Sequence, residues 1–206
     1  FDCNLPEFFD TELMLALKLE LPKTISRITD RKFQDLCHKN PESRIERTSE
    51  GDIVIMAPTG GETGKRNFLL AVKIGTWNEK AKLGVLFDSS TAFKLSSSAI
   101  RSPDIAFVKN KKWNSISKEE KKKFPPLCPD FVIELLSDSD SILLTKEKMD
   151  EWMKNGCALA WLIDFEDQTI YIYRKDKPTQ ELKGLKHTLS GESVLPGFQL
   201  NLKEIL

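Results

Sequence analysis

The sequence predicts an α/β fold in which helices flank a mixed central sheet. Apolar runs of strand length alternate with amphipathic runs of helix length along the 206 residues. Between residues 131 and 163 the order is strand, helix, strand, which implies a parallel crossover because a helix joins the two strands. Shorter strands that follow one another directly precede this unit, so the sheet should contain both parallel and antiparallel pairs.

Local patterns predict the elements of the first half. Apolar residues recur with helical spacing in two segments, and the second, longer helix should turn Leu69, Val72 and Trp77 inward. The polar segment 49–52 contains a glycine and is typical of a hairpin turn, so a strand is expected on each side of it. These patterns predict a helix at residues 29–40, strands at 44–47 and 53–56, a long helix to about 80, and strands at 84–87, 92–95 and 105–108.

A lysine-rich polar segment, residues 109–123, opens the second half and should lie on the surface. Pro125 and Pro126 end it, since a proline disfavours helical backbone in the residue before it. Gly156 is expected to cap the C-terminus of the helix that follows the next strand. The expected elements are a short helix at 118–123, a strand at 131–136, a helix at 142–155, strands at 159–163 and 169–173, and a last short strand and turn within 193–206.

Length and composition favour one intracellular domain. A chain of 206 residues fits a single core, which we expect to span residues 28–206 after an N-terminal extension, residues 1–27. The chain begins with Phe1 instead of Met, which leaves its N-terminus open. No apolar stretch reaches the roughly 18 to 20 residues of a membrane-spanning helix. The four cysteines are widely scattered, which favours reduced thiols in a cytoplasmic protein without membrane contact.

The charge balance argues against a protein that binds nucleic acid by overall attraction. Lys and Arg number 31, and Asp and Glu also number 31, so the net charge is zero. A local basic groove can still exist in a neutral protein. The lysines of residues 109–123 are the candidates for such a groove, and the alternative is an ordinary solvated surface.

Two acids occupy strands that otherwise read as buried. Glu134 interrupts the apolar run 131–136, and Asp104 heads the run 105–108. An ionised carboxylate away from water costs several kcal/mol unless it is paired, protonated or bound to a metal. Strand alternation places Glu134 on the face opposite Ile133, where it can face solvent or share a cleft with Asp104. Two such carboxylates are typical ligands of Mg²⁺.

A lysine on the following helix could complete this group. Leu144, Lys148 and Trp152 recur at four-residue spacing, so Lys148 lies at the border of the apolar face. Its ammonium could reach the acids or a bound phosphate, or it could extend to solvent while its stem covers apolar surface.

As a set, several motifs resemble those of the Uma-type restriction-endonuclease family, which belongs to the PD-(D/E)XK nuclease superfamily. The resemblance covers residues 28 to 195, nearly the whole chain. It implies a restriction-endonuclease-like fold. The matching segments are residues 44–47, 57–64, 87–91, 101–104, 128–135, Gly156 and residues 161–164.

The resemblance also implies roles for individual residues. Asp104 of the Pro103-Asp104 dipeptide and Glu134 would bind Mg²⁺ or Mn²⁺. Leu136 occupies the position where the superfamily usually has its catalytic lysine, so Lys148 would take over from the helix. The backbone carbonyl of the intervening Leu135 could add a ligand.

Other acids have competing interpretations. Glu62, near the start of the long helix, matches an additional acid of the superfamily but is equally typical of a helix start. Asp130 belongs to a second Pro-Asp dipeptide, and we assign it to a turn or strand start. Asp138 and Asp140 fit helix capping at least as well as catalysis.

The sequence therefore predicts a Mg²⁺-dependent endonuclease that hydrolyses DNA, acting as a homodimer if it cuts both strands. Two alternatives stay open. The first is a catalytically inactive nucleic-acid-binding module with the nuclease fold, which the neutral charge and the leucine at position 136 favour. The second is a homodimeric interaction or accessory protein.

Overall fold

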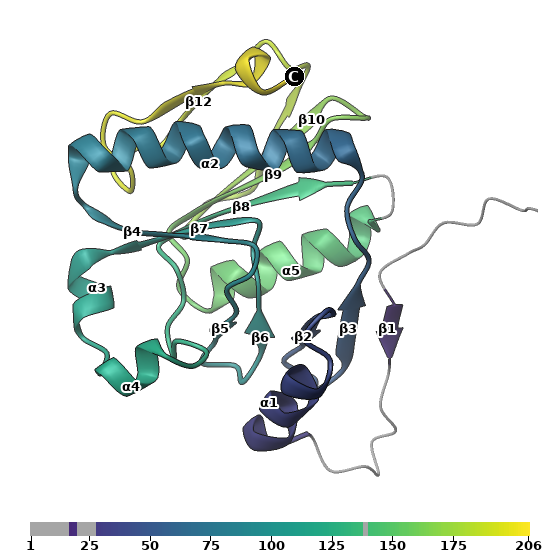
Figure 1. Cartoon of the computed structure of the whole chain (residues 1–206). Helices are drawn as coiled ribbons and strands as arrows, with labels where there is room; N and C mark the ends of the chain where they lie inside the picture. Colours follow the sequence, from purple (N-terminus) through teal and green to yellow (C-terminus); the bar gives the residue numbers. More distant parts are fainter. Residues whose placement is uncertain (1–16, 20–27, 138–139) are drawn as a thin grey trace, which may run out of the picture.

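A six-stranded mixed sheet forms the centre of the computed structural model, which describes residues 17–19, 28–137 and 140–206 (Figure 1). The strand order is β11-β10-β9-β8-β7-β4. Strands β8 and β9 are parallel and the other described neighbours antiparallel, so the predicted α/β fold with a mixed sheet is confirmed. The strands are β4 (Gly84–Asp88), β7 (Ile105–Lys109), β8 (Phe131–Leu136), β9 (Leu159–Asp164), β10 (Thr169–Arg174) and β11 (Gln180–Lys183).

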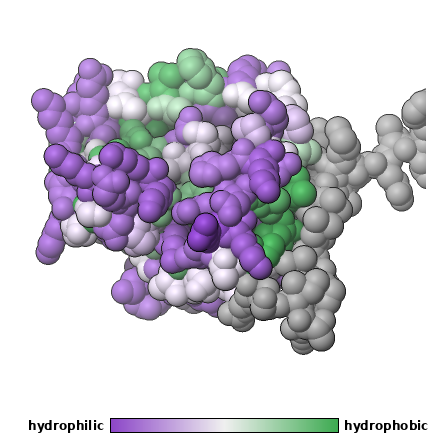
Figure 2. Space-filling view, turned by 60° about the horizontal axis from the view of Figure 1, so that its bottom comes forward, coloured by the Kyte–Doolittle hydropathy of each residue, from purple (hydrophilic) through white to green (hydrophobic). Residues whose placement is uncertain are grey.

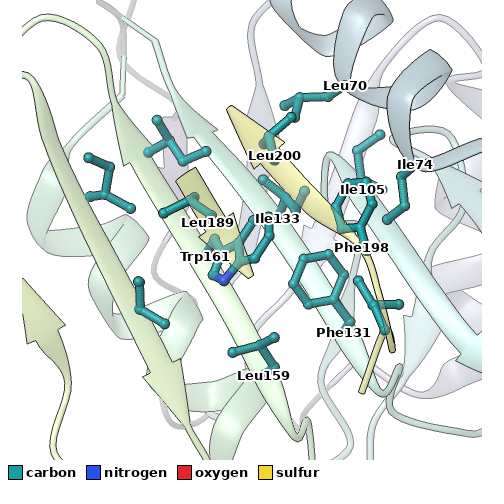
Figure 3. Packing of buried hydrophobic residues seen from close by; sticks show 14 of the residues in the cluster. Leu70, Ile74, Ile105, Phe131, Ile133, Leu159, Trp161, Leu189, Phe198 and Leu200 are labelled. Atoms are coloured by element: carbon teal, nitrogen blue, oxygen red, sulfur yellow. The ribbon is translucent and has the colours of Figure 1, made fainter. Parts of the chain in front are cut away.

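One long helix covers each face of this sheet: α2 (Gly61–Ala81) one face and α5 (Ile142–Lys154) the other (Figure 1). Because side chains alternate along a strand, Phe131 and Ile133 of β8 join the apolar cluster under α2 (Figure 3). Val132 joins the cluster under α5. Glu134 shares the face of Val132, so its carboxylate lies on the α5 side within an apolar layer.

The inward face of α2 differs from the predicted stripe. Leu70 and Ile74 are buried and pack on the sheet, whereas Leu69 and Trp77 are only partly buried against the same cluster. Val72 is 46% exposed. The helix is apolar around much of its circumference, so packing on the sheet decides which residues face inward.

A second, five-stranded sheet has the order β1-β3-β2-β6-β5. Helix α1 (Asp30–Lys39) packs on it through Phe33, which contacts a cluster containing Ile45, Ile53 and Ile100. Part of the predicted N-terminal extension forms β1, which pairs with β3. The strands are β1 (Leu17–Leu19), β2 (Arg44–Arg47), β3 (Ile53–Met56), β5 (Phe93–Lys94) and β6 (Ile100–Arg101).

The remaining elements are short, and several of them were not predicted. Their bounds are α3 (Asn110–Asn114), α4 (Lys118–Lys121), β12 (Thr188–Ser190), β13 (Gln199–Asn201) and the 3₁₀ helix η1 (Leu202–Ile205). The sequence patterns missed β6, α3, β11 and β12, which are too short or too polar to show a periodic signal. Cys37, Cys128 and Cys157 are free thiols, and Cys3 lies outside the described residues. Among the described helices, none is long and apolar enough to cross a membrane.

Gly84 and Gly75 provide a matched test of the packing between β4 and β7. A Cβ on Gly84 would lie 2.3 Å from the Val108 carbonyl oxygen and 2.5 Å from the Phe107 ring. We expect Gly84→Ala to destabilise the protein by about 1–3 kcal/mol. A Cβ on Gly75, inside α2, meets no atom within 4 Å. Gly75→Ala should therefore stabilise it by about 0.5–1 kcal/mol, because alanine favours the helix. Thermal unfolding measures both, and equal midpoints would contradict the predicted close approach.

Candidate active site

Asp104 and Glu134 lie side by side at one end of the central sheet. The antiparallel register of β7 and β8 pairs Ile105 with Ile133, so its continuation by one residue sets Asp104 opposite Glu134. Oδ2 of Asp104 accepts a hydrogen bond from the Leu135 amide at 2.8 Å. The two carboxylates therefore share one face of the sheet, where cross-strand neighbours lie about 5 Å apart.

Lys148 reaches this pair from α5, which decides between the two orientations that its helical spacing left open. Its Nζ lies 2.9 Å from Oε1 of Glu134 and 2.8 Å from the Ser102 carbonyl oxygen. Trp152, one turn further along α5, donates from Nε1 to the same Glu134 oxygen at 3.1 Å. Lys148 is only 7% exposed, so its ammonium is committed to the acids and does not extend to solvent.

Glu46 of β2 completes the group, although the sequence reasoning did not single it out. Its Oε1 lies 3.0 Å from Nζ of Lys148 and accepts the Ser102 amide at 2.9 Å. Its Oε2 accepts from Arg101 at 3.1 Å, and Arg101 also pairs with Glu151 of α5. The available signal was strand alternation, which places Glu46 on the face of β2 opposite the apolar Ile45.

These groups line one cavity of about 340 Å³ at the junction of the two sheets. Its wall comes from β2 and β3, the first turns of α2 and α5, the segment between β6 and β7, and the end of β8. Apolar side chains such as Met56 and Leu144 form part of the wall. The cavity thus brings Asp104, Glu134 and Lys148 to one accessible site.

Burial leaves the two strand acids short of compensating charge. Burial is the largest influence on Glu134 and raises its pKa to about 7, against the opposing effect of Lys148. The neighbouring Asp104 and Glu46 carboxylates raise it further. Burial also raises the pKa of Asp104, although the Leu135 amide, Lys148 and Arg44 oppose that shift. Both carboxylates would be stabilised as anions by an additional cation.

Glu46 and Lys148 behave in the opposite way. Burial alone would raise the pKa of Glu46, but Lys148 and Arg101 outweigh it and hold that pKa below its usual value. Burial alone would lower the pKa of Lys148, but Glu134 and Glu46 outweigh it and raise that pKa. Glu46 is therefore a permanent anion and Lys148 a permanent cation near neutral pH.

The available oxygen atoms at this site suit a hard divalent cation. Oδ1 of Asp104 and Oε2 of Glu134 accept none of the hydrogen bonds found among the described residues. Both oxygens of Glu46, in contrast, are occupied by hydrogen-bond donors. No group of three or more His, Cys, Asp or Glu side chains in the described parts of the chain is arranged to hold a metal ion. Two carboxylates fit Mg²⁺, which keeps several water ligands, and do not fit a closed zinc site.

Glu62 is not brought to this group. It lies in the first turn of α2, its side chain is 68% exposed, and its carboxylate pairs with Lys65 at 3.0 Å. It is absent from the lining of the cavity. The structure thus supports its interpretation as a helix-start acid.

The other acids weighed in the sequence have structural partners or lie outside the described residues. Asp130 precedes β8 at the end away from Glu134 and accepts from the Lys109 amide, so it acts at a strand start. Asp140 accepts from the Ser137 amide in the turn before α5, and Ser141 is the N-cap. Asp138 lies outside the described residues.

The lysine-rich segment lies far from the cavity. It forms α3 and α4 at the left of Figure 1, whereas β8 points to the right. Lys112 pairs with Asp130, which is four residues, or about 13 Å, from Glu134 along the strand. Figure 2 brings the lower side of Figure 1 forward and shows a largely hydrophilic face. This segment does not extend the cavity as a basic groove.

Comparison with known proteins identifies a family. Residues 30–203 match the model of the Uma2 family, which is described as "Putative restriction endonuclease". The chain belongs to the Uma2 family. The match contains every residue of the site, from Glu46 to Trp152, and confirms the resemblance inferred from the motifs.

A solved structure shows the same fold. It is described as a "putative nuclease belonging to DUF820" from Anabaena variabilis ATCC 29413, and the TM-score is 0.68. The sequences are 22% identical, and the match covers 80% of this chain and 90% of that chain. No match was found among curated proteins.

The raised pKa of Glu134 predicts a pH-dependent gain in stability for Glu134→Gln. Below pH 4.5, the pKa of this carboxyl in the unfolded chain, the group is protonated in both the folded and the unfolded state, so folding buries no charge. Between pH 4.5 and about pH 7 this carboxyl ionises only in the unfolded chain. Above about pH 7 it is ionised in both states, and the folded protein bears the full free-energy cost of burying the charge. Without metal, the free energy of unfolding of Glu134→Gln should therefore equal that of the wild type near pH 4. Near pH 8 it should be higher than that of the wild type by on the order of 2 kcal/mol.

Chemical denaturation in EDTA at several pH values measures this difference. The wild type should lose stability relative to Glu134→Gln as the pH rises through about 7. A variant less stable than the wild type at pH 8 would show that the ion pair with Lys148 outweighs the cost of burial.

Proposed function

We propose that this Uma2-family chain is a metal-dependent endodeoxyribonuclease that hydrolyses DNA phosphodiester bonds. One observation carries the proposal: Asp104 and Glu134, both short of compensating charge, meet the Lys148 ammonium in a single cavity. Family membership supports a nuclease, and the arrangement supplies the groups that phosphodiester hydrolysis needs.

Asp104 and Glu134 would hold Mg²⁺ or Mn²⁺ through their available oxygen atoms. Such an ion, when bound, lowers the pKa of a coordinated water and stabilises negative charge on a phosphate. The Leu135 amide fixes the orientation of Asp104, and the Trp152 indole fixes that of Glu134. Both carboxylates are thus positioned before any ligand arrives.

Lys148 would act as a cation and not as a base. Because Glu134 and Glu46 raise its pKa, its amine keeps the proton near neutral pH and cannot accept one from water. Its three N–H groups are held by Glu134, Glu46 and the Ser102 carbonyl, and its positive charge can stabilise the negative charge that develops on the phosphate. Glu46 would position this ammonium, since its own oxygens are occupied by Lys148, Arg101 and the Ser102 amide.

Cleavage of both strands of a duplex would require two such sites. Each chain supplies one, so we propose a homodimer with two-fold symmetry for double-strand cleavage. A monomer would be restricted to nicking one strand in each encounter.

The metal site can be tested by calorimetric titration with Mn²⁺ or Mg²⁺. We expect the wild type to bind the ion, and Asp104→Asn and Glu134→Gln to lose binding because each removes a ligand charge. The same samples should be assayed for plasmid nicking, where only the wild type should be active. Equal and negligible binding by all three proteins would contradict the proposal.

Lys148→Met separates metal binding from hydrolysis. This variant should still bind the ion, because both carboxylates stay, but should cut at least about 100-fold more slowly, because the cation near the phosphate is lost. Single-turnover cleavage measures the rate, and circular dichroism verifies the fold. A wild type that binds DNA and metal without cutting would favour the inactive binding module instead.

A further inference from the structure

We propose that Arg44 is the residue that binds a DNA phosphate beside Asp104 in this cavity. The inference rests on the proposed function, because it assigns a binding group for the same substrate. Arg44 lies at the start of β2 and lines the cavity together with Glu46. Residues two apart in a strand share a face, so both side chains are directed toward the acids.

The guanidinium of Arg44 has donors without an acceptor. Its Nε and Nη2 are shielded from solvent, and neither atom has a hydrogen-bond partner among the residues that the structure describes. Leaving a charged donor buried and unpaired destabilises a folded protein. Such an arrangement is explained if the acceptor is a ligand that completes the site.

The other cations of the cavity are already committed. Lys148 contacts Glu46, Glu134 and the Ser102 carbonyl. Arg101 pairs with Glu46 and Glu151. Within the described lining, Arg44 is thus the basic residue that pairs with no acid, and its Nε and Nη2 have no acceptor.

The charge of the cavity makes such a donor necessary. The described lining contains five acids and three basic residues, which are Arg44, Arg101 and Lys148. The formal charge of this lining is −2, and one divalent ion bound by Asp104 and Glu134 would only neutralise it, so the cavity would offer a phosphodiester no net attraction. Arg44 also opposes the rise in the pKa of Asp104, which places its charge near that carboxylate.

Arginine suits this task better than lysine. Its planar guanidinium presents parallel N–H groups that match two oxygens of one phosphate, whereas lysine supplies a single point charge. Nε and Nη2 are the pair of donors that forms such a fork. The geometry favours a phosphate contact that positions the DNA backbone and reads no base sequence.

The test measures binding of a fluorescently labelled DNA duplex by anisotropy in EDTA, so that no metal-dependent cutting occurs. Arg44→Met should weaken binding at least about tenfold, and Arg44→Lys should recover part of the loss. The slope of log Kd against log salt concentration should fall by about one in Arg44→Met, as expected for one lost phosphate contact. Arg174→Met is the matched control, because it removes the same charge from β10, outside the cavity lining, where Arg174 pairs with Glu192.

Thermal unfolding separates this role from a structural one. Arg44→Met should be at least as stable as the wild type, because it removes an unpaired buried charge. Arg101→Met should be less stable, since it removes the ion-pair partner of Glu151 and one of the two cations that pair with Glu46. A loss of stability in Arg44→Met as large as that in Arg101→Met would overturn the inference.

The binding results also distinguish this inference from the proposed function. If the wild type binds and nicks DNA and Arg44→Met binds equally well with an unchanged salt slope, only the role of Arg44 is overturned. If Arg174→Met weakens binding as much as Arg44→Met, the effect is one of overall charge and the specific contact is overturned. If the wild type binds no DNA, the proposed function fails, and the inference fails with it.

Discussion

The structure of the site depends on the buried ammonium of Lys148. It contacts Glu134 on β8, Glu46 on β2 and the Ser102 carbonyl in the segment that leads into β7. One charge on α5 therefore joins both sheets at the point where the cavity opens between them. A buried ammonium is tolerated only where its charge and donors are satisfied, and Glu46, Glu134 and the Ser102 carbonyl together satisfy those of Lys148.

Charge is divided unequally among the acids around this lysine. Glu46 is neutralised by Lys148 and Arg101, and its lowered pKa reflects this. Asp104 and Glu134 receive less compensation, and burial raises the pKa of both. The first arrangement stabilises the fold, whereas the second lowers its stability and is explained by the cation site that we propose. A carboxylate pair used only for structure would not need this cost.

Strand and helix periodicity accounted for the parts of the site that lie close in sequence. An acid inside an apolar strand identified Glu134. Four-residue spacing placed Lys148 at the border of the apolar face of the next helix, and the family resemblance implied that it reaches the acid. The same reasoning could not reach Glu46, because β2 belongs to the other sheet and the packing of the two sheets is a tertiary property. It also assigned the inward face of α2 only in part: Leu69 and Trp77 pack against the core cluster as predicted, whereas Val72 is exposed and Ile74 is buried. Packing on the sheet decides which apolar residues of this helix face inward.

The helix position of the lysine has a physical explanation in the packing of α5. Leu136, at the usual lysine position of the superfamily, is on the same face of β8 as Glu134, and α5 covers that face. A side chain of α5, which packs on this face, can therefore reach the carboxylate of Glu134. The side chain two residues further along β8 is then not needed for that contact. Lys148 and Trp152 lie one helical turn apart, and both contact Oε1 of Glu134, so one helix fixes the charge and the orientation of the acid. The proposed hydrolysis would require an ammonium at this place, and the chain element that delivers it is free to differ.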